Sequence, residues 1–339
     1  MTGSLPPDPL ALLDPDAARV IHMITLLGRP PIETLPVAAA RAAADRAFAS
    51  FAAPAPAMAE VMELPASPLG PPVALRLYRV TPRGVPGPAV VFFHGGGWVL
   101  GSLDTHEPFC RRLAEASAGT VIAAGYRLAP EHPFPAAVED ALAATCFIQR
   151  HATRFGLDPR RLFLAGDSAG GTLAAVTAQA LRATGLAGQI LLYPATDLAR
   201  RQEEQPANPA HALLSAAAIG WFKRLYLGPS SRPEDLRASP LRHPDLAGLP
   251  PALVITVGQD LLCAEATDYV QALRRAGTPV RHHHLSGQIH GFLTMDRVIA
   301  AATPCLGEIA AFVAPGGARP ELNPGGGAAT PPAPRGRCQ

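Results

Sequence analysis

Short apolar runs alternate along the chain with longer segments in which apolar residues recur every three or four positions. The continuous runs predict strands buried on both faces of a sheet, and alternating segments predict further strands; together they lie at residues 73–80, 89–93, 120–126, 161–165, 189–193, 252–257 and 280–285. The periodic segments predict helices at residues 10–27, 36–51, 107–117, 136–155, 169–184, 266–276 and 296–313. Strands and helices in alternation are typical of an α/β fold, in which a mostly parallel sheet carries helices on both faces.

One segment interrupts this alternation. Residues 196–247 begin polar and proline-rich, contain the helical stretch "HALLSAAAIGWFKRLYLG" and return to loop, which indicates an insertion above the sheet. We therefore expect N-terminal cap helices (1–55), a core (56–314) that carries a cap insertion at about 198–240, and a tail (315–339). The tail is rich in proline and glycine with few large apolar side chains, so we expect it to be disordered.

Composition narrows the class of protein. The chain has 339 residues, of which 48% are hydrophobic, and its formal net charge of +2 gives no reason to expect nucleic acid as a partner. The five cysteines are scattered without a C-x-x-C pair, and the N-terminus lacks a secretory signal. No apolar stretch reaches the ~18 residues of a membrane span. These features predict a cytoplasmic protein and are compatible with a homodimer.

A serine stands between glycines directly after one of the apolar runs. The residues Gly166-Asp167-Ser168-Ala169-Gly170 match the pattern G-x-S-x-G in the strand–turn–helix context that this pattern requires. The glycines let strand and helix approach closely, and the turn exposes the hydroxyl group above the sheet at the N-terminus of a helix. The alternative is a plain strand-to-helix turn, where glycine and serine are common.

A serine hydroxyl needs a base, and the base needs an orienting carboxylate. His290 lies in "GQIHGF", after the last predicted strand, where a triad in the chain order Ser, Asp, His places its base. Asp260 follows the apolar run "ALVITV" at the carboxyl end of a strand, where α/β proteins build their sites. Glu265 and Asp268 are rival carboxylates inside the next predicted helix, and Asp260 is also suited to capping that helix.

A run of three glycines follows the buried strand 89–93. In "HGGGW", residues 94–98, the glycines allow backbone N–H groups to turn toward one point, as an oxyanion site requires. The alternatives are a flexible turn and a phosphate-binding loop. A phosphate-binding loop has a lysine after its glycines, and this sequence has none there.

These motifs together resemble the hormone-sensitive-lipase-like (bacterial family IV) esterases of the α/β-hydrolase superfamily. The resemblance rests on "HGGGW", "YRLAPEHPFPAA", "GDSAGG", "YP" and "HGF", which span residues 94–292. It implies an eight-stranded, mostly parallel sheet with helices on both faces and a helical cap. The sequence departs from the family where the acid lies: "DLLCAE" has Leu261 where the family has proline and Ala264 where it has aspartate. The loss of proline is expected to loosen this loop.

The resemblance also implies the roles of the site residues. Ser168 is expected to be the nucleophile, His290 the general base and acid, and Asp260 the residue that orients His290. The N–H groups of Gly96, Gly97 and Ala169 are expected to form the oxyanion hole. No metal or organic cofactor is implied.

The expected function is that of a serine carboxylesterase acting on short- to medium-chain acyl esters. Amidase, deacetylase or lactonase activity on the same triad is the alternative, because the motifs report acyl transfer and not the leaving group. A small-molecule binding module without catalysis is a further alternative, which the presence of His290 disfavours. Side chains expected to line a substrate pocket are Trp98, Asp167, Leu213, Trp221 and Phe222. Core packing is the alternative for the three aromatic residues, and Asp167 is expected to hold the hydrogen bonds of the turn at Ser168 rather than to transfer protons.

Three consecutive histidines, His282 to His284, suggest a metal site. On a strand only His282 and His284 share a face, and a zinc site needs three or four converging ligands. We therefore expect no metal there.

Overall fold

Eight strands form one sheet in the computed structural model of the chain, which describes residues 10–67, 73–81, 87–202, 208–229 and 231–318. The strands are β1 (Glu60–Leu64), β2 (Ala74–Arg79), β3 (Ala89–Phe93), β4 (Thr120–Gly125), β5 (Leu162–Asp167), β6 (Gly188–Leu192), β7 (Ala252–Gln259) and β8 (Val280–Ile289). Their order across the sheet is β1-β2-β4-β3-β5-β6-β7-β8. β2 runs antiparallel to both of its neighbours, and the other pairs are parallel. The predicted fold class is confirmed.

Eight α-helices belong to the same described part of the chain. They are α1 (Pro15–Leu26), α2 (Val37–Phe51), α3 (Glu107–Ala116), α4 (Ala136–Arg150), α5 (Ala169–Ala180), α6 (Ala216–Leu227), α7 (Cys263–Arg275) and α8 (Ala302–Val313).

The strand β1 has no counterpart among the predicted elements. Its residues alternate between half-buried and exposed at the edge of the sheet, so it lacks the continuous apolar run that marks the inner strands.

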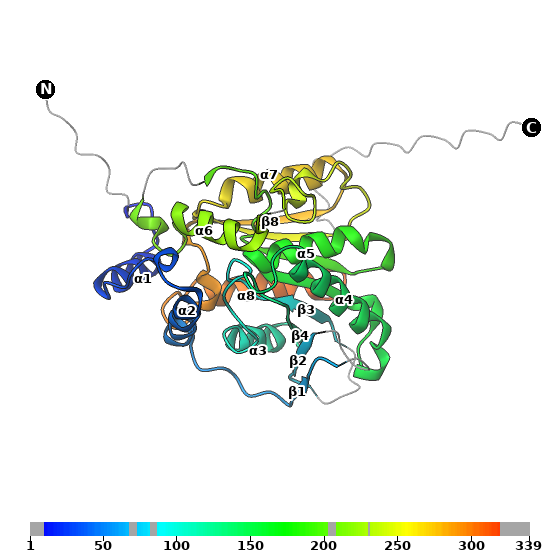
Figure 1. Ribbon diagram of the computed structural model, residues 1–339. Helices are drawn as coiled ribbons and strands as arrows, with labels where there is room; N and C mark the ends of the chain where they lie inside the picture. The colour runs from blue at the N-terminus through cyan, green and yellow to red at the C-terminus, as the bar shows by residue number, and fades with distance from the viewer. Residues whose placement is uncertain (1–9, 68–72, 82–86, 203–207, 230, 319–339) are drawn as a thin grey trace, which may run out of the picture.

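Each face of the sheet has its own apolar core. Along β3, Val91 and Phe93 pack in one core with residues of α4, α5 and α7, whereas Val90 and Phe92 pack in the other with residues of α3 and α8. Successive side chains of a strand point to opposite faces, so this division follows directly from the pleat. The sheet therefore lies between two helical layers (Figure 1).

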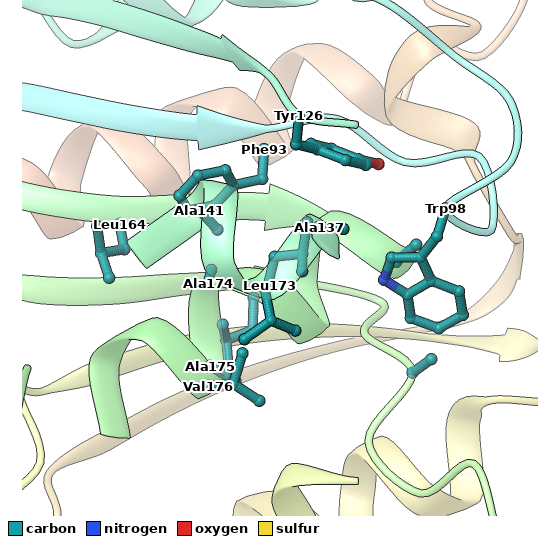
Figure 2. Close-up of a cluster of buried hydrophobic side chains, with 14 of the residues drawn as sticks. Phe93, Trp98, Tyr126, Ala137, Ala141, Leu164, Leu173, Ala174, Ala175 and Val176 are labelled. Carbon is teal, nitrogen blue, oxygen red and sulfur yellow. The ribbon is translucent and has the colours of Figure 1, made fainter. Parts of the chain in front are cut away.

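Small residues let α5 lie very close to the sheet. Figure 2 shows Leu173 and Ala174 of α5 with Phe93 of β3 and Ala137 and Ala141 of α4, all in the first of the two cores. The short side chains of the three alanines leave room for α4 and α5 to pack near the strands. The close packing positions the N-terminus of α5 just beyond the end of β5.

α1, α2 and α6 gather at one end of the sheet (Figure 1). No α-helix in the described ranges is long and apolar enough to cross a bilayer. The predicted disordered tail falls from residue 319 onward outside the described residues, as does part of the expected cap insertion, residues 203–207 and 230.

Candidate active site

Ser168 occupies a strained turn between β5 and α5. Its backbone has φ 53° and ψ −118°, a region that side chains other than glycine rarely adopt. A Cβ atom on Gly166 would lie 2.2 Å from the Gly170 carbonyl oxygen, and one on Gly170 would lie 1.9 Å from the Phe93 carbonyl oxygen. The flanking glycines are therefore required by the close approach of strand and helix, as predicted.

The structure brings Ser168, His290 and Asp260 together from three strand ends. The Oγ atom of Ser168 lies 2.8 Å from Nε2 of His290, and Nδ1 of His290 lies 2.7 Å from Oδ2 of Asp260. An ionised carboxylate only accepts hydrogen bonds, so Nδ1 carries the proton and Nε2 is left to accept the proton of the serine hydroxyl. The geometry suits activation of the hydroxyl.

Further contacts fix the imidazole and the carboxylate. The ring of Tyr193, itself at a positive φ of 37°, packs edge-on against the His290 ring with 5.0 Å between centroids. The second oxygen of Asp260, Oδ1, accepts a hydrogen bond from the Leu262 N–H at 2.9 Å. Asp260 is buried, and both of its carboxylate oxygens accept hydrogen bonds.

The rival carboxylates lie elsewhere. Oε1 of Glu265 accepts hydrogen bonds from the N–H groups of Thr196 and Asp197, and Asp268 forms an ion pair with Arg200. The structure therefore pairs His290 with Asp260.

The loop after β3 has the strained backbone that an oxyanion site needs. Gly96, Gly97 and Trp98 all have positive φ, at 113°, 61° and 61°. The Gly96 carbonyl oxygen accepts hydrogen bonds from the Val99 and Leu100 N–H groups. In a trans peptide the C=O and the following N–H point in opposite directions, so these bonds fix the direction of the Gly97 N–H.

The other two expected donors, the N–H groups of Gly96 and Ala169, are directed in the same way. The Gly95 carbonyl oxygen lies 2.8 Å from Nδ1 of His94, which fixes the direction of the Gly96 N–H. The Ser168 carbonyl oxygen accepts a hydrogen bond from the Thr172 N–H, which fixes the Ala169 N–H. All three donor peptides are thus held by their carbonyl ends before any substrate arrives.

His94 is a neutral imidazole in this arrangement. It is buried and stacks on Tyr126, with 4.3 Å between ring centroids. Burial, with a smaller contribution from the charge of His106, lowers the pKa of His94 to about 4. A neutral ring with its proton on Nδ1 donates to the Gly95 carbonyl oxygen.

A cavity of about 840 Å³ opens above Ser168, and Gly96, Gly97, Ala169 and His290 line it as well. Most of its wall is apolar. Three alanines spaced four residues apart on α2 line one side, and α6 and the preceding turn line another; the apolar members include Ala39, Ala43, Ala47, Phe48, Phe51, Leu213, Leu214 and Phe222. The apolar periodicity of residues 36–51 predicted a helix but did not indicate that its alanine face lines the cavity.

Four of the five predicted pocket residues line this cavity. They are Trp98, Asp167, Leu213 and Phe222. The prediction for Trp221 was wrong. Its ring is buried against Phe222 with 5.0 Å between centroids, on a different face of α6 from the one that borders the cavity.

One part of the cavity wall is polar. Gln202 donates a hydrogen bond to Oε2 of Glu265, and Lys223 of α6 donates to the Gln202 side-chain oxygen at 2.7 Å. Burial raises the pKa of Glu265 to about 8, against the effect of the N–H groups that bind it. These contacts connect α6 to α7.

Two of the three histidines on β8 contact the same hydroxyl group. His282 and His284 share a face as expected, and both contact the hydroxyl of Thr256, at 2.8 and 2.9 Å. No group of three metal-ligating side chains occurs among the residues that the structure describes.

Comparison with known proteins finds hydrolases and esterases similar to this chain. A family model described as an α/β hydrolase fold matches residues 90–294. The chain is 40% identical to Esterase LipI of Mycobacterium tuberculosis over 240 residues, 68% of this chain and 74% of that protein. It is 44% identical to Carboxylic ester hydrolase LipN of the same organism over 232 residues, 66% of this chain and 61% of that protein.

A solved structure extends the likeness to nearly the whole described chain. The ester hydrolase EH1AB1 from the metagenome of Lake Arreo, complexed with a bipyridine phosphonate derivative, superposes with a TM-score of 0.82 at 39% identity. The match covers 89% of this chain and 98% of that one. The chain belongs to the α/β-hydrolase family, in its hormone-sensitive-lipase-like group.

Proposed function

We propose that this carboxylic ester hydrolase acts on short- to medium-chain acyl esters through an acyl-enzyme formed on Ser168. The observation that carries the proposal is the continuous chain of hydrogen bonds from Ser168 through His290 to Asp260 at an apolar cavity. Residues of α1, α2 and α6 line that cavity, and we propose that these helices form its cap.

Acylation begins when Oγ of Ser168 attacks the ester carbonyl carbon while Nε2 of His290 takes the hydroxyl proton. The resulting imidazolium is stabilised by the carboxylate of Asp260. The carbonyl oxygen becomes an oxyanion, which the N–H groups of Gly96, Gly97 and Ala169 bind. His290 then protonates the alkoxide, the carbon–oxygen bond to the alcohol breaks, and the acyl group stays on Ser168.

Deacylation repeats these steps with water. His290 takes a proton from water, the hydroxide attacks the acyl carbon, and the oxyanion forms in the same place. The bond to Oγ then breaks as His290 returns the proton to Ser168, which releases the carboxylic acid. Each step uses groups of this chain and water.

The cavity supports the choice of substrate class. Its apolar walls offer burial for a hydrocarbon chain at about 0.8 kcal/mol per methylene. A volume of about 840 Å³ exceeds what an acetyl group fills, so affinity should rise with chain length until the wall formed by α2 and α6 is reached.

The test is hydrolysis of p-nitrophenyl esters from acetate to dodecanoate by the native protein and by Ser168→Ala. We expect a maximum in kcat/KM at short or medium chain length, and a loss of at least about 10³-fold in the variant. Equal rates in the two proteins would refute the proposal. Matched esters and amides separate esterase from amidase activity, and a fluorophosphonate that fails to label Ser168 would indicate a binding module.

A further inference from the structure

A buried pair of titratable side chains lies behind the oxyanion loop and takes no part in the mechanism above. Asp167 is 5% exposed and His106 is 1% exposed. Oδ2 of Asp167 lies 3.4 Å from Nε2 of His106. His106 stands directly before α3, 61 residues from its partner.

Asp167 connects the nucleophile to the oxyanion loop. It is the last residue of β5 and precedes Ser168, and its Oδ1 accepts a hydrogen bond from the Gly95 N–H at 2.7 Å. The contact is tight, because a Cβ atom on Gly95 would lie 2.4 Å from Oδ2. Gly95 immediately precedes the two glycine donors, so this hydrogen bond sets their distance from Ser168.

The same carboxylate poses an electrostatic problem. A buried negative charge beside Ser168 repels the oxyanion that forms during attack, and repulsion is strong where water is excluded. Burial alone would raise the pKa of Asp167, but the charge and hydrogen bond of His106 outweigh burial and lower it. Asp167 is therefore ionised, and a buried carboxylate requires a compensating charge.

The contacts of His106 supply that charge. Its Nδ1 lies 2.9 Å from the Thr105 hydroxyl oxygen, which donates its own proton to the Ser102 carbonyl oxygen at 3.0 Å. The carboxylate accepts hydrogen bonds only, so Nε2 is the donor to Asp167. With the Thr105 hydroxyl proton directed at the Ser102 carbonyl oxygen, Nδ1 is placed to donate to the hydroxyl oxygen, and a ring that donates from both nitrogens is an imidazolium.

Packing holds this ring in place. The ring of Phe48, a residue that lines the cavity, lies 4.9 Å from the His106 ring between centroids. The ring of Phe92, which packs in the core with residues of α3 and α8, lies 6.1 Å away. Apolar neighbours keep water from the pair and strengthen the attraction between its charges.

We propose that His106 is a positioning residue of this esterase: its imidazolium neutralises Asp167 and, through Asp167, holds the oxyanion loop at the distance from Ser168 that catalysis needs. The inference rests on the proposed function, since it concerns the same oxyanion site. In this role His106 makes no contact with the substrate.

The test compares His106→Asn, Asp167→Asn and the double variant on p-nitrophenyl butyrate. His106→Asn leaves a buried carboxylate without its counter-charge, so we expect kcat to fall about 10- to 100-fold with little change in KM. Asp167→Asn keeps an oxygen for the Gly95 N–H and removes the charge. We therefore expect it to lose less, and expect the double variant to recover at least about fivefold over His106→Asn.

His151→Asn is the matched control. His151 is a half-buried histidine whose Nδ1 lies 2.9 Å from the Phe147 carbonyl oxygen; it caps α4 and lies outside the cavity wall, far from any carboxylate of the active site. It should keep the native kcat. A merely structural role for His106 predicts instead that the losses of the two single variants add in the double variant.

A second measurement does not depend on ester hydrolysis. The ¹⁵N chemical shifts of the His106 ring in the native protein report whether both nitrogens are protonated, and they decide the matter even if His106→Asn fails to fold. A neutral ring, a native kcat in His106→Asn, or a double variant no better than His106→Asn would each overturn the inference. A native protein inactive on every ester would overturn the proposed function, while the ¹⁵N shifts would still test the ion pair.

Discussion

Single side chains at this site have to satisfy two partners at once, and Asp260 shows the consequence. Its two oxygens accept from His290 Nδ1 and from the Leu262 N–H. Asp260→Asn has one oxygen for two donors, so its NH₂ group faces one of them and favours the wrong tautomer of His290. We expect kcat to fall about 10³- to 10⁴-fold, as measured by steady-state hydrolysis with active-site titration.

A carboxylate on the next helix provides the control for this prediction. Asp268 is half-exposed and pairs with Arg200, so Asp268→Asn should keep the native kcat. A loss smaller than about tenfold in Asp260→Asn would show that His290 takes its orientation from another group.

At the residue scale, the reacting groups could be predicted from the sequence, but most of the residues that hold them in place could not. We could predict Ser168, Asp260 and His290 because each follows a strand that its apolar run identifies, and the ends of parallel strands meet at one edge of the sheet. The sequence of an apolar helix does not show which of its faces borders a cavity, so Trp221 was wrongly predicted to line the pocket with Phe222. His106 had no signal, because its partner Asp167 is close only in the folded chain.

At the scale of elements, the approach of α5 to β3 has little tolerance. A Cβ atom on Gly170 would lie 1.9 Å from the Phe93 carbonyl oxygen, which belongs to the backbone and cannot rotate away. Gly170→Ala must therefore push the helix off the strand. We expect the free energy of unfolding in urea to fall by about 1–3 kcal/mol or more, with loss of esterase activity as Ser168 moves.

Gly307 offers a matched control inside α8. A Cβ atom there meets nothing within 4 Å, so Gly307→Ala gains helix propensity without a clash. It should raise the free energy of unfolding by about 0.5–1 kcal/mol. If Gly170→Ala were as stable as Gly307→Ala, the close approach of α5 would not be a constraint on the fold.

At the scale of the whole molecule, the alternation of apolar runs and helical segments was enough to predict the layered sheet. It missed β1, because an edge strand with Glu60 and Glu63 has only one half-buried face. It also left open how α6 is joined to the core. That joint is the chain of contacts from Lys223 through Gln202 to Glu265, made by side chains from three separate segments.

This joint should make the stability of the molecule depend on pH. The folded-state pKa of Glu265 is raised from 4.5 to about 8. Between these values the unfolded chain releases a proton that the folded chain retains, so the free energy of unfolding should fall by about 1.4 kcal/mol per pH unit as pH rises. Below this window both states are protonated and above it both are ionised, so the contribution of Glu265 is constant there.

Glu265→Gln cannot ionise and should lack this slope. Urea unfolding at pH 5, 6, 7 and 8 measures the difference in unfolding free energy between the variant and the native protein, and that difference should shift in favour of the variant as pH rises. Glu234→Gln, on an exposed residue, is the matched control for a change of carboxyl to amide. A difference between Glu265→Gln and the native protein that is the same at pH 5 and pH 8 would mean that the folded chain binds no extra proton at Glu265. The contacts of Gln202 and Lys223 would then hold the carboxylate ionised, because three donors and a nearby ammonium would have outweighed its burial.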